Sequence, residues 1–271
     1  MKTGTKVVLG IALSFSLLGI FFGVFGYYTG GIDDIRAKAE ATTQKYTKTF
    51  DNLDSLTVSG ENYLIVTSGN VTKPTLTYTK VKAQNSIYTT DYSFKNGELS
   101  LTSKASYATS RHISGGLLDL AREGFSFDNQ ITLTLPKNSN LKTISVSNIS
   151  GFILKNLRLK DTTIETSSYF ETTNVNLDST KLSVNYNTID MKQTTLINTN
   201  ITIQDGDFEG NGLTFKQKNS IIADGIDISL NDYNLTVTHN AEEDDDITKR
   251  LTASSENTLN LVARDDDITV Q

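Results

Sequence analysis

The sequence predicts an all-β protein, namely a β-solenoid with coils of about 19 residues and three short strands each, behind one N-terminal transmembrane helix. Three observations support this: an apolar run at residues 7–28, alternation of apolar and polar residues from Leu53 onward, and repetition of that alternation beyond Pro136. The predicted divisions are 1–28 (cytoplasmic stub and anchor), 29–50 (extracytoplasmic stalk) and 51–271 (solenoid domain).

The segment Val7–Tyr28 contains no charged residue, and it is long enough to cross a hydrocarbon core of about 30 Å as a helix. Lys2 and Lys6 precede it, whereas Asp33 and Asp34 follow it, and positive flanks stay in the cytoplasm. We therefore expect a single-pass protein of the cell membrane with a cytoplasmic N-terminus. The alternative is a cleaved signal peptide, which would have a shorter apolar region and a small-residue cleavage site.

Residues 29–50 are polar, which is typical of a stalk. From Leu53 the period becomes two, which indicates strands with one buried face. The alternating pairs are Leu56/Val58, Leu64/Val66, Leu76/Tyr78, Leu99/Leu101, Phe125/Phe127 and Ile131/Leu133/Leu135. The dipeptides Ser68-Gly69 and Asn96-Gly97 are expected to form turns between strands.

Beyond Pro136 three apolar series recur together, and each is expected to form one wall of the solenoid. The first is Ile144/Val146, Ile164/Thr166, Leu182/Val184, Ile201/Ile203, Ile221/Ala223 and Leu235/Val237. The second is Phe152/Leu154, Tyr169, Ile189/Met191, Phe208 and Ile226/Ile228, and the third is Leu157/Leu159, Val175/Leu177, Leu196, Leu213/Phe215 and Leu230. An antiparallel sandwich is the alternative, since its strands recur every 8–12 residues, but hairpin signals are few here.

Three stretches carry a resemblance to a known family: Ile131–Phe152 (a strand, Pro136, then a turn with Gly151), Asp205–Gly210, and Asn257–Val270. Together they resemble the bacterial adhesin-like β-strand-repeat family of unknown function. The resemblance covers residues 50–271. It implies a membrane-anchored, envelope-facing protein of Firmicutes, with some members linked to envelope stress. Tyr169-Phe170 and Asn187-Thr188 stand where the family has a turn glycine.

Composition excludes several function classes. Without Lys2 and Lys6, the rest of the chain contains 23 basic and 31 acidic residues. This excess of negative charge argues against a nucleic-acid partner. The chain has no cysteine, which excludes disulfides and thiolate metal sites. We expect no cofactor. The partner is expected to be an envelope component or a membrane protein, and Gly19 and Gly23 form a helix-pairing motif through which the chain could form a homo-oligomer.

Candidate chemistry is sparse. His112 and His239 lie in unrelated segments without a nucleophile motif, so no catalytic residue is assigned. The candidates for a Ca²⁺ site are carboxylates from neighbouring turns, which supply hard oxygen ligands: Asp205, Asp207, Glu209, Asp224 and Asp227. Solvated turn residues are the plainer interpretation.

Residues 110–125 interrupt the strand pattern and suggest a short amphipathic helix, either a docking element or a cover for the solenoid end.

We therefore expect a non-enzymatic, extracytoplasmic solenoid on a Gram-positive cell, which binds or scaffolds an envelope component. One alternative is a carbohydrate-active enzyme that acts on surface glycans, because such enzymes also occur on solenoids. Another is a self-associating structural surface protein with unprotected solenoid ends.

Overall fold

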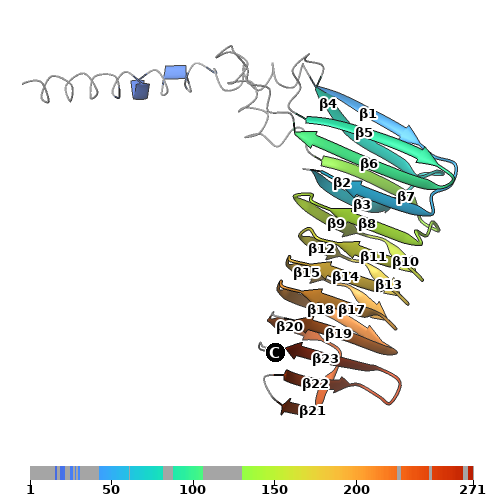
Figure 1. The fold of residues 1–271 in the computed structure, drawn as a ribbon, viewed down its shortest axis with the longest axis vertical. Coiled ribbons are helices and arrows are strands. Elements are labelled where there is room, and N and C mark those ends of the chain that lie inside the picture. Colours follow the sequence, from blue (N-terminus) through green and yellow to red (C-terminus); the bar gives the residue numbers. More distant parts are fainter. Residues whose placement is uncertain are drawn as a thin grey trace, which may run out of the picture.

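The structure is a computed structural model that describes residues 16, 19–21, 25, 26, 28, 30, 43–60, 62–81, 88–105, 130–224, 227–243, 246–264 and 268–270. They form an elongated stack of strands (Figure 1). Most of the predicted anchor Val7–Tyr28, including Gly23, lies outside the described residues, and so does the segment 110–125. No helix in the described part of the chain is both long enough and apolar enough to cross a membrane.

The N-terminal strands are β1 (Thr43–Thr49), β2 (Ser55–Ser59), β3 (Tyr63–Gly69), β4 (Thr75–Val81), β5 (Tyr88–Lys95), β6 (Glu98–Ala105) and β7 (Gln130–Pro136). The central strands are β8 (Thr143–Ser147), β9 (Gly151–Lys155), β10 (Arg158–Lys160), β11 (Thr163–Thr166), β12 (Phe170–Thr173), β13 (Asn176–Asp178), β14 (Lys181–Asn185), β15 (Ile189–Lys192), β16 (Thr195–Ile197), β17 (Asn200–Gln204) and β18 (Phe208–Lys216). The C-terminal strands are β19 (Lys218–Asp224), β20 (Ile228–Tyr233), β21 (Thr236–Glu243), β22 (Asp246–Thr252), β23 (Thr258–Arg264) and β24 (Ile268–Val270).

Among the described residues these strands form an 11-stranded and a 13-stranded sheet. The central part of the 11-stranded sheet is the parallel series β8, β11, β14, β17 and β19. The 13-stranded sheet contains two walls, β9-β12-β15-β18 and β10-β13-β16-β18, which join in the long strand β18. Three parallel walls, each receiving one strand per coil, define a β-solenoid and confirm that prediction over the sandwich.

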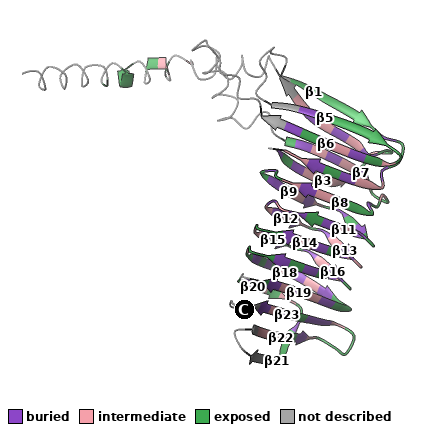
Figure 2. Ribbon diagram, in the orientation of Figure 1, coloured by how far each residue is buried: buried purple, intermediate pink, exposed green. Residues whose placement is uncertain are grey.

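Like residues stack on like in the core, as the first apolar series predicts. Ile144 pairs with Ile164, which pairs with Leu182, and Leu182 with Ile201. All four are at most 1% exposed. Figure 2 shows buried positions alternating with less buried ones along the strands of the central coils. Because one coil cannot bury its own face, this stacking supplies the hydrophobic core.

The N-terminal coils follow a spatial order that differs from their order in the sequence. Strands β2 and β3 pair with β8 and β9 on one side and with β6 and β7 on the other, all in parallel. The β6/β7 coil therefore lies outside the earlier β2/β3 coil. Beyond it, the antiparallel strands β5 and β4 continue the two sheets, and β1 pairs with β4. At the other end, β21 and β22 are also antiparallel.

Most corners between the walls are turned by a residue in the left-handed region, and these residues form columns. The corner before the β10 wall has Asn156, Asn174, Gln193 and Gly212, with φ between 48° and 67°. The corner after that wall has Asp161, Ser179, Asn198 and Gln217, and the third corner has Asn148, Tyr186 and Asp205. The N–H of most corner residues donates to a main-chain oxygen of the next coil, as in Asp161 N to Asp178 O at 2.9 Å. Asn and Asp tolerate this conformation better than most residues, so glycine is not required at these corners.

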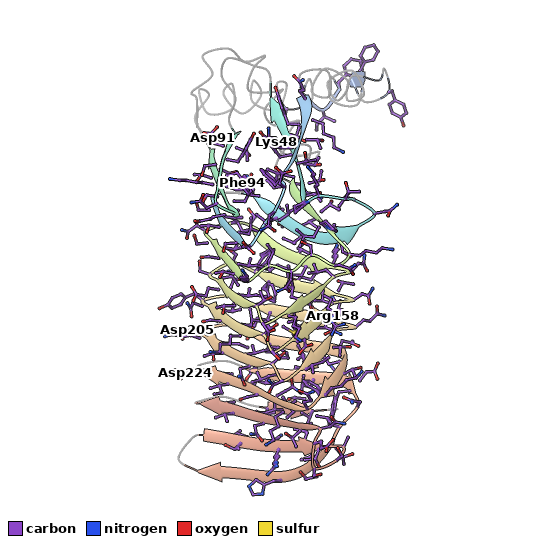
Figure 3. All side chains as sticks on the ribbon, turned by 90° about the vertical axis from the view of Figure 1, so that its right-hand side faces the viewer. Lys48, Asp91, Phe94, Arg158, Asp205 and Asp224 are labelled. Atoms are coloured by element: carbon purple, nitrogen blue, oxygen red, sulfur yellow. The ribbon has the colours of Figure 1, made fainter. Side chains whose placement is uncertain are left out.

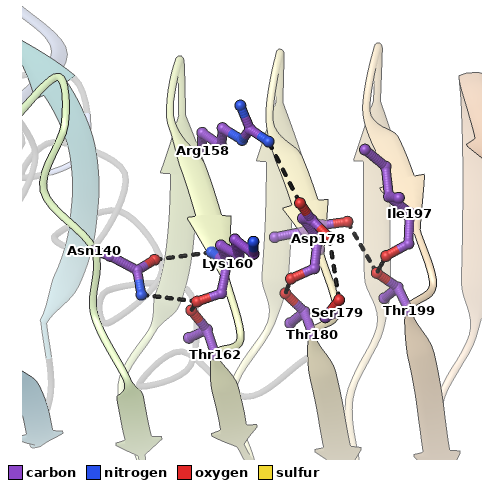
Figure 4. A network of polar contacts seen from close by, with 10 residues as sticks. Asn140, Arg158, Lys160, Thr162, Asp178, Ser179, Thr180, Ile197 and Thr199 are labelled. Carbon is purple, nitrogen blue, oxygen red and sulfur yellow. Dashed lines mark hydrogen bonds and ion pairs between the residues drawn. The ribbon is translucent and has the colours of Figure 1, made fainter.

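Asparagine side chains close both edges of the β10-β13-β16-β18 wall. At one edge Asn140 Oδ1 accepts from Lys160 N at 2.8 Å, and Asn140 Nδ2 donates to Lys160 O at 2.7 Å (Figure 4). At the other edge Asn234 makes the same pair of bonds with Phe215. Each amide thus takes the place of the peptide group that a further coil would supply. In the corner after this wall, buried Thr162 and Thr199 donate their hydroxyls to main-chain oxygens of the preceding coil.

Several predicted details need correction. The sheet begins at β1, inside the predicted stalk 29–50. The sequence did not predict this strand, because an edge strand as polar as TQKYTKT looks like a linker. Phe170, not Tyr169, continues the second series, since it pairs with Phe152 and Ile189. Leu230 lies on the β9 wall, opposite Gly210.

The first series does not continue through Leu235/Val237, because β21 turns back as a hairpin and leaves Val237 39% exposed. Leu261 of β23 takes that place next to Ile221. Asn96 and Gly97 both have positive φ in the β5–β6 turn, as predicted, whereas Ser68 and Gly69 are the last residues of β3.

Candidate functional site: the outer face of the 11-stranded sheet

The outward positions of β11, β14 and β17 form a continuous polar surface, here called the polar face: Thr163, Glu165, Lys181, Ser183, Asn200 and Thr202. They alternate with the buried residues of the first apolar series, so the same period of two that builds the core also places these side chains outside. Parallel register aligns them in columns, with Glu165 beside Ser183 and Ser183 beside Thr202.

An open depression of about 320 Å³ lies on the polar face and is lined by all six of these residues, with Ile164 and Leu182 at its base. Ser183 lies between Glu165 and Thr202 in the register, so it is at the centre. Lys181 is next to Thr163 on one side and Asn200 on the other. The depression is therefore rimmed by one carboxylate, one ammonium group, an amide and three hydroxyls.

This set of groups is suited to recognition rather than to bond cleavage. Hydroxyl and amide groups both donate and accept hydrogen bonds, which matches the hydroxyl-rich surface of a polyol or glycan. The six side chains of the polar face include no histidine and a single carboxylate, whereas glycoside hydrolysis uses a pair of carboxyl groups about 5–10 Å apart. A ligand here would be held by polar contacts on a rigid sheet.

A second cluster lies on the outer face of the 13-stranded sheet, where Glu171, Asp190 and Glu209 are aligned on neighbouring strands. Asp190 binds both Lys192 and the hydroxyl of Tyr169. Burial, followed by the charges of Asp190 and Glu171, raises the pKa of Tyr169. The hydrogen bond to Asp190 raises the pKa of Lys192. Asp190 is thus already paired within the protein.

The structure separates the predicted Ca²⁺ ligands into three places. Asp205 N donates to Asp224 O at 2.9 Å, which puts these residues at one corner of neighbouring coils (Figure 3). Asp207 and Asp227 immediately precede the adjacent strands β18 and β20, and Phe208 N donates to Asp227 O. Glu209 belongs to the column with Asp190. In the described part of the chain no three His, Cys, Asp or Glu side chains are grouped to hold a metal ion.

The two histidines do not meet in a described site. His239 is exposed on the hairpin strand β21, opposite Arg250, and His112 lies outside the described residues. Sequence reasoning overlooked the polar face because it attended to acidic clusters. The sequence did contain a pattern that predicts this face. Glu165, Ser183 and Thr202 each stand between the two members of a buried pair of the first apolar series, and such middle positions point outward.

Comparison with known proteins gives a family match and a distant structural neighbour. No curated protein is similar enough in sequence to count as a relative. One solved structure, that of a "putative cell adhesion protein" from Clostridium sporogenes, matches 84% of this chain and 98% of its own at 12% identity and a TM-score of 0.31. That likeness is too distant to assign a fold, ligand or partner. The family model described as Toastrack DUF4097 matches residues 55–271, and the chain therefore belongs to the Toastrack DUF4097 family.

Proposed function

We propose that this protein is a membrane-anchored, non-catalytic binding protein of the Gram-positive cell envelope, and that its polar face holds a glycan-rich envelope component. The observation that carries the proposal is the depression lined by Thr163, Glu165, Lys181, Ser183, Asn200 and Thr202. A stacked solenoid keeps these side chains on a rigid surface without a reactive pair, which suits binding more than turnover.

The uncharged run Val7–Tyr28 and its charge asymmetry support the anchor and the exterior location of the solenoid. Protected solenoid edges argue for a binding role over the self-associating alternative. The edge strand β21 has a bulge between Val237 and His239, while the edge strand β1 carries the exposed Lys45 and Lys48. Bulges and charges on edge strands discourage edge-to-edge pairing.

Sedimentation with purified Gram-positive peptidoglycan sacculi tests this function. The full chain in detergent is expected to sediment with the sacculi. Ser183→Arg is expected to lower the apparent affinity about tenfold, which corresponds to about 1.4 kcal/mol, because the long side chain fills the depression.

The matched control is Asn211→Arg, which adds the same side chain to the exposed outer face of the other sheet and is expected to bind like the unmodified protein. Absence of binding by the unmodified chain, or equal affinities for all three proteins, would contradict the proposed role of the polar face. Release of soluble sugar fragments from the sacculi would favour the enzyme alternative.

A further inference from the structure

Inward-facing aromatic rings are exposed at the N-terminal end of the solenoid. On β5, Tyr92 pairs with Leu101 and Phe94 with Leu99, so the rings face the same side as core residues. Leu99 and Leu101 are completely buried, yet Tyr92 and Phe94 are each 37% exposed, because β5 is the last strand of its sheet. The core thus ends in a partly exposed aromatic layer.

This layer, here called the aromatic end, consists of Tyr46, Phe50, Tyr78, Tyr92 and Phe94, and it joins the two sheets. The ring centroids of Phe50 and Phe94 are 4.7 Å apart, those of Phe50 and Tyr92 6.1 Å, and those of Tyr78 and Tyr92 6.4 Å. Tyr46 stacks on Tyr78 at 5.8 Å. Figure 3 shows Phe94 at this end together with Lys48 and Asp91. Phe50 and Tyr78 are buried, and they support the rings of Tyr46, Tyr92 and Phe94, which are each 37% exposed. These three rings are therefore preorganised on a packed aromatic layer and are not isolated exposed residues.

The two ends of the solenoid have opposite charge. Residues 43–105 contain seven basic and five acidic residues, whereas residues 227–271 contain three basic and eleven acidic ones. Lys45 and Lys48 lie exposed on β1, the outermost strand beside the aromatic end. An anionic surface therefore attracts the N-terminal end and repels the C-terminal end.

The short link between the apolar run and β1 also places the N-terminal end of the solenoid near the membrane. The strand β1 begins at Thr43, fifteen residues after Tyr28, where the apolar run ends. Even a fully extended chain spans only about 3.3–3.6 Å per residue, so Thr43 would lie within about 50 Å of the anchor. The aromatic end is therefore the end of the solenoid nearest to a bilayer that holds residues 7–28.

We propose that the aromatic end docks on the lipid surface, with its rings at the headgroup level and Lys45 and Lys48 against anionic lipid phosphates. Aromatic rings with a polar group prefer this depth, and lysines near an anionic surface are attracted to it. The solenoid then stands upright on the membrane, and the polar face lies parallel to the membrane normal, open to the envelope. This inference rests on the membrane anchor of the proposed function.

The chain contains no tryptophan, so a single introduced tryptophan reports its own surroundings. The experiment uses the full chain reconstituted in liposomes that contain phosphatidylglycerol and lipids brominated on their acyl chains. The fluorescence of Tyr92→Trp is expected to shift to shorter wavelength and to be quenched severalfold by the brominated lipid. Tyr186→Trp is the matched control, because Tyr186 is 67% exposed on a central coil, and it is expected to stay unquenched.

Replacing both lysines, as Lys45→Glu with Lys48→Glu, is expected to remove most of the quenching at Tyr92→Trp. Unquenched Tyr92→Trp in protein that floats with the liposomes would overturn the docking while leaving the anchor intact. A blue-shifted but unquenched signal would place the rings against protein, either a second copy of the chain or the segment 110–125, and would also overturn the docking. Protein that fails to float with the liposomes would instead contradict the anchor, and with it the proposed function.

Discussion

Ile201→Asp is expected to unfold the solenoid, whereas Thr202→Asp, one residue away, is expected to leave it folded. Ile201 is 1% exposed and stacks between Leu182 and Ile221, so an aspartate there buries an unpaired carboxylate. The cost of about 3–5 kcal/mol is comparable with the whole stability of a typical domain. Thr202 is exposed, and its replacement should cost about 0.5 kcal/mol or less.

Urea denaturation followed by circular dichroism gives the unfolding midpoint of each variant. Ile203→Asp is a second variant of the buried kind, since Ile203 is fully buried. Equal unfolding midpoints for Thr202→Asp and the two isoleucine variants would show that the inward and outward positions of β17 are assigned incorrectly.

Gly206→Ala is expected to destabilise the solenoid through a clash between coils. A Cβ atom at position 206 would lie 2.0 Å from the main-chain oxygen of Asn187, so the two coils would have to separate. Overpacking of this kind costs about 1–3 kcal/mol, and more where the backbone has to move. Thermal unfolding is expected to occur at a clearly lower temperature than in the unmodified protein.

Gly212→Asn is the control for this variant. Gly212 has a φ of +67°, but it belongs to the corner column in which Asn156 and Asn174 have φ values of 52° and 55°. Asparagine should therefore be accepted with a change of about 0.5 kcal/mol or less. If Gly212→Asn lowered the unfolding temperature as much as Gly206→Ala, the column would not explain how the corners tolerate residues other than glycine.

The core of the central coils was predictable because two independent periods agree there. Alternation selects the buried face, and spacings of 18 to 20 residues align Ile144, Ile164, Leu182, Ile201 and Ile221. The corners were less predictable, since the expected glycines are replaced by residues such as Asn174 and Tyr186 with φ values of 55° and 61°. Local sequence preferences alone do not distinguish these residues from ordinary loop residues.

The ends were the least predictable part, because their arrangement depends on long-range pairing. Nothing local in β6 or β7 indicates that they lie outside the earlier strands β2 and β3. The polar face escaped prediction for a related reason. Glu165, Ser183 and Thr202 are separated in the sequence by 18 and 19 residues, and only the register of the coils brings them together in one depression.

The exterior location of the polar face is the central claim, and labelling of single cysteines in intact, wall-stripped cells tests it most directly. The chain has no native cysteine, so Ser183→Cys places one thiol on the polar face and Thr3→Cys places one before the apolar run. A membrane-impermeant maleimide is expected to label Ser183→Cys in intact cells, and Thr3→Cys only after lysis. Labelling of Ser183→Cys only after lysis would contradict the account.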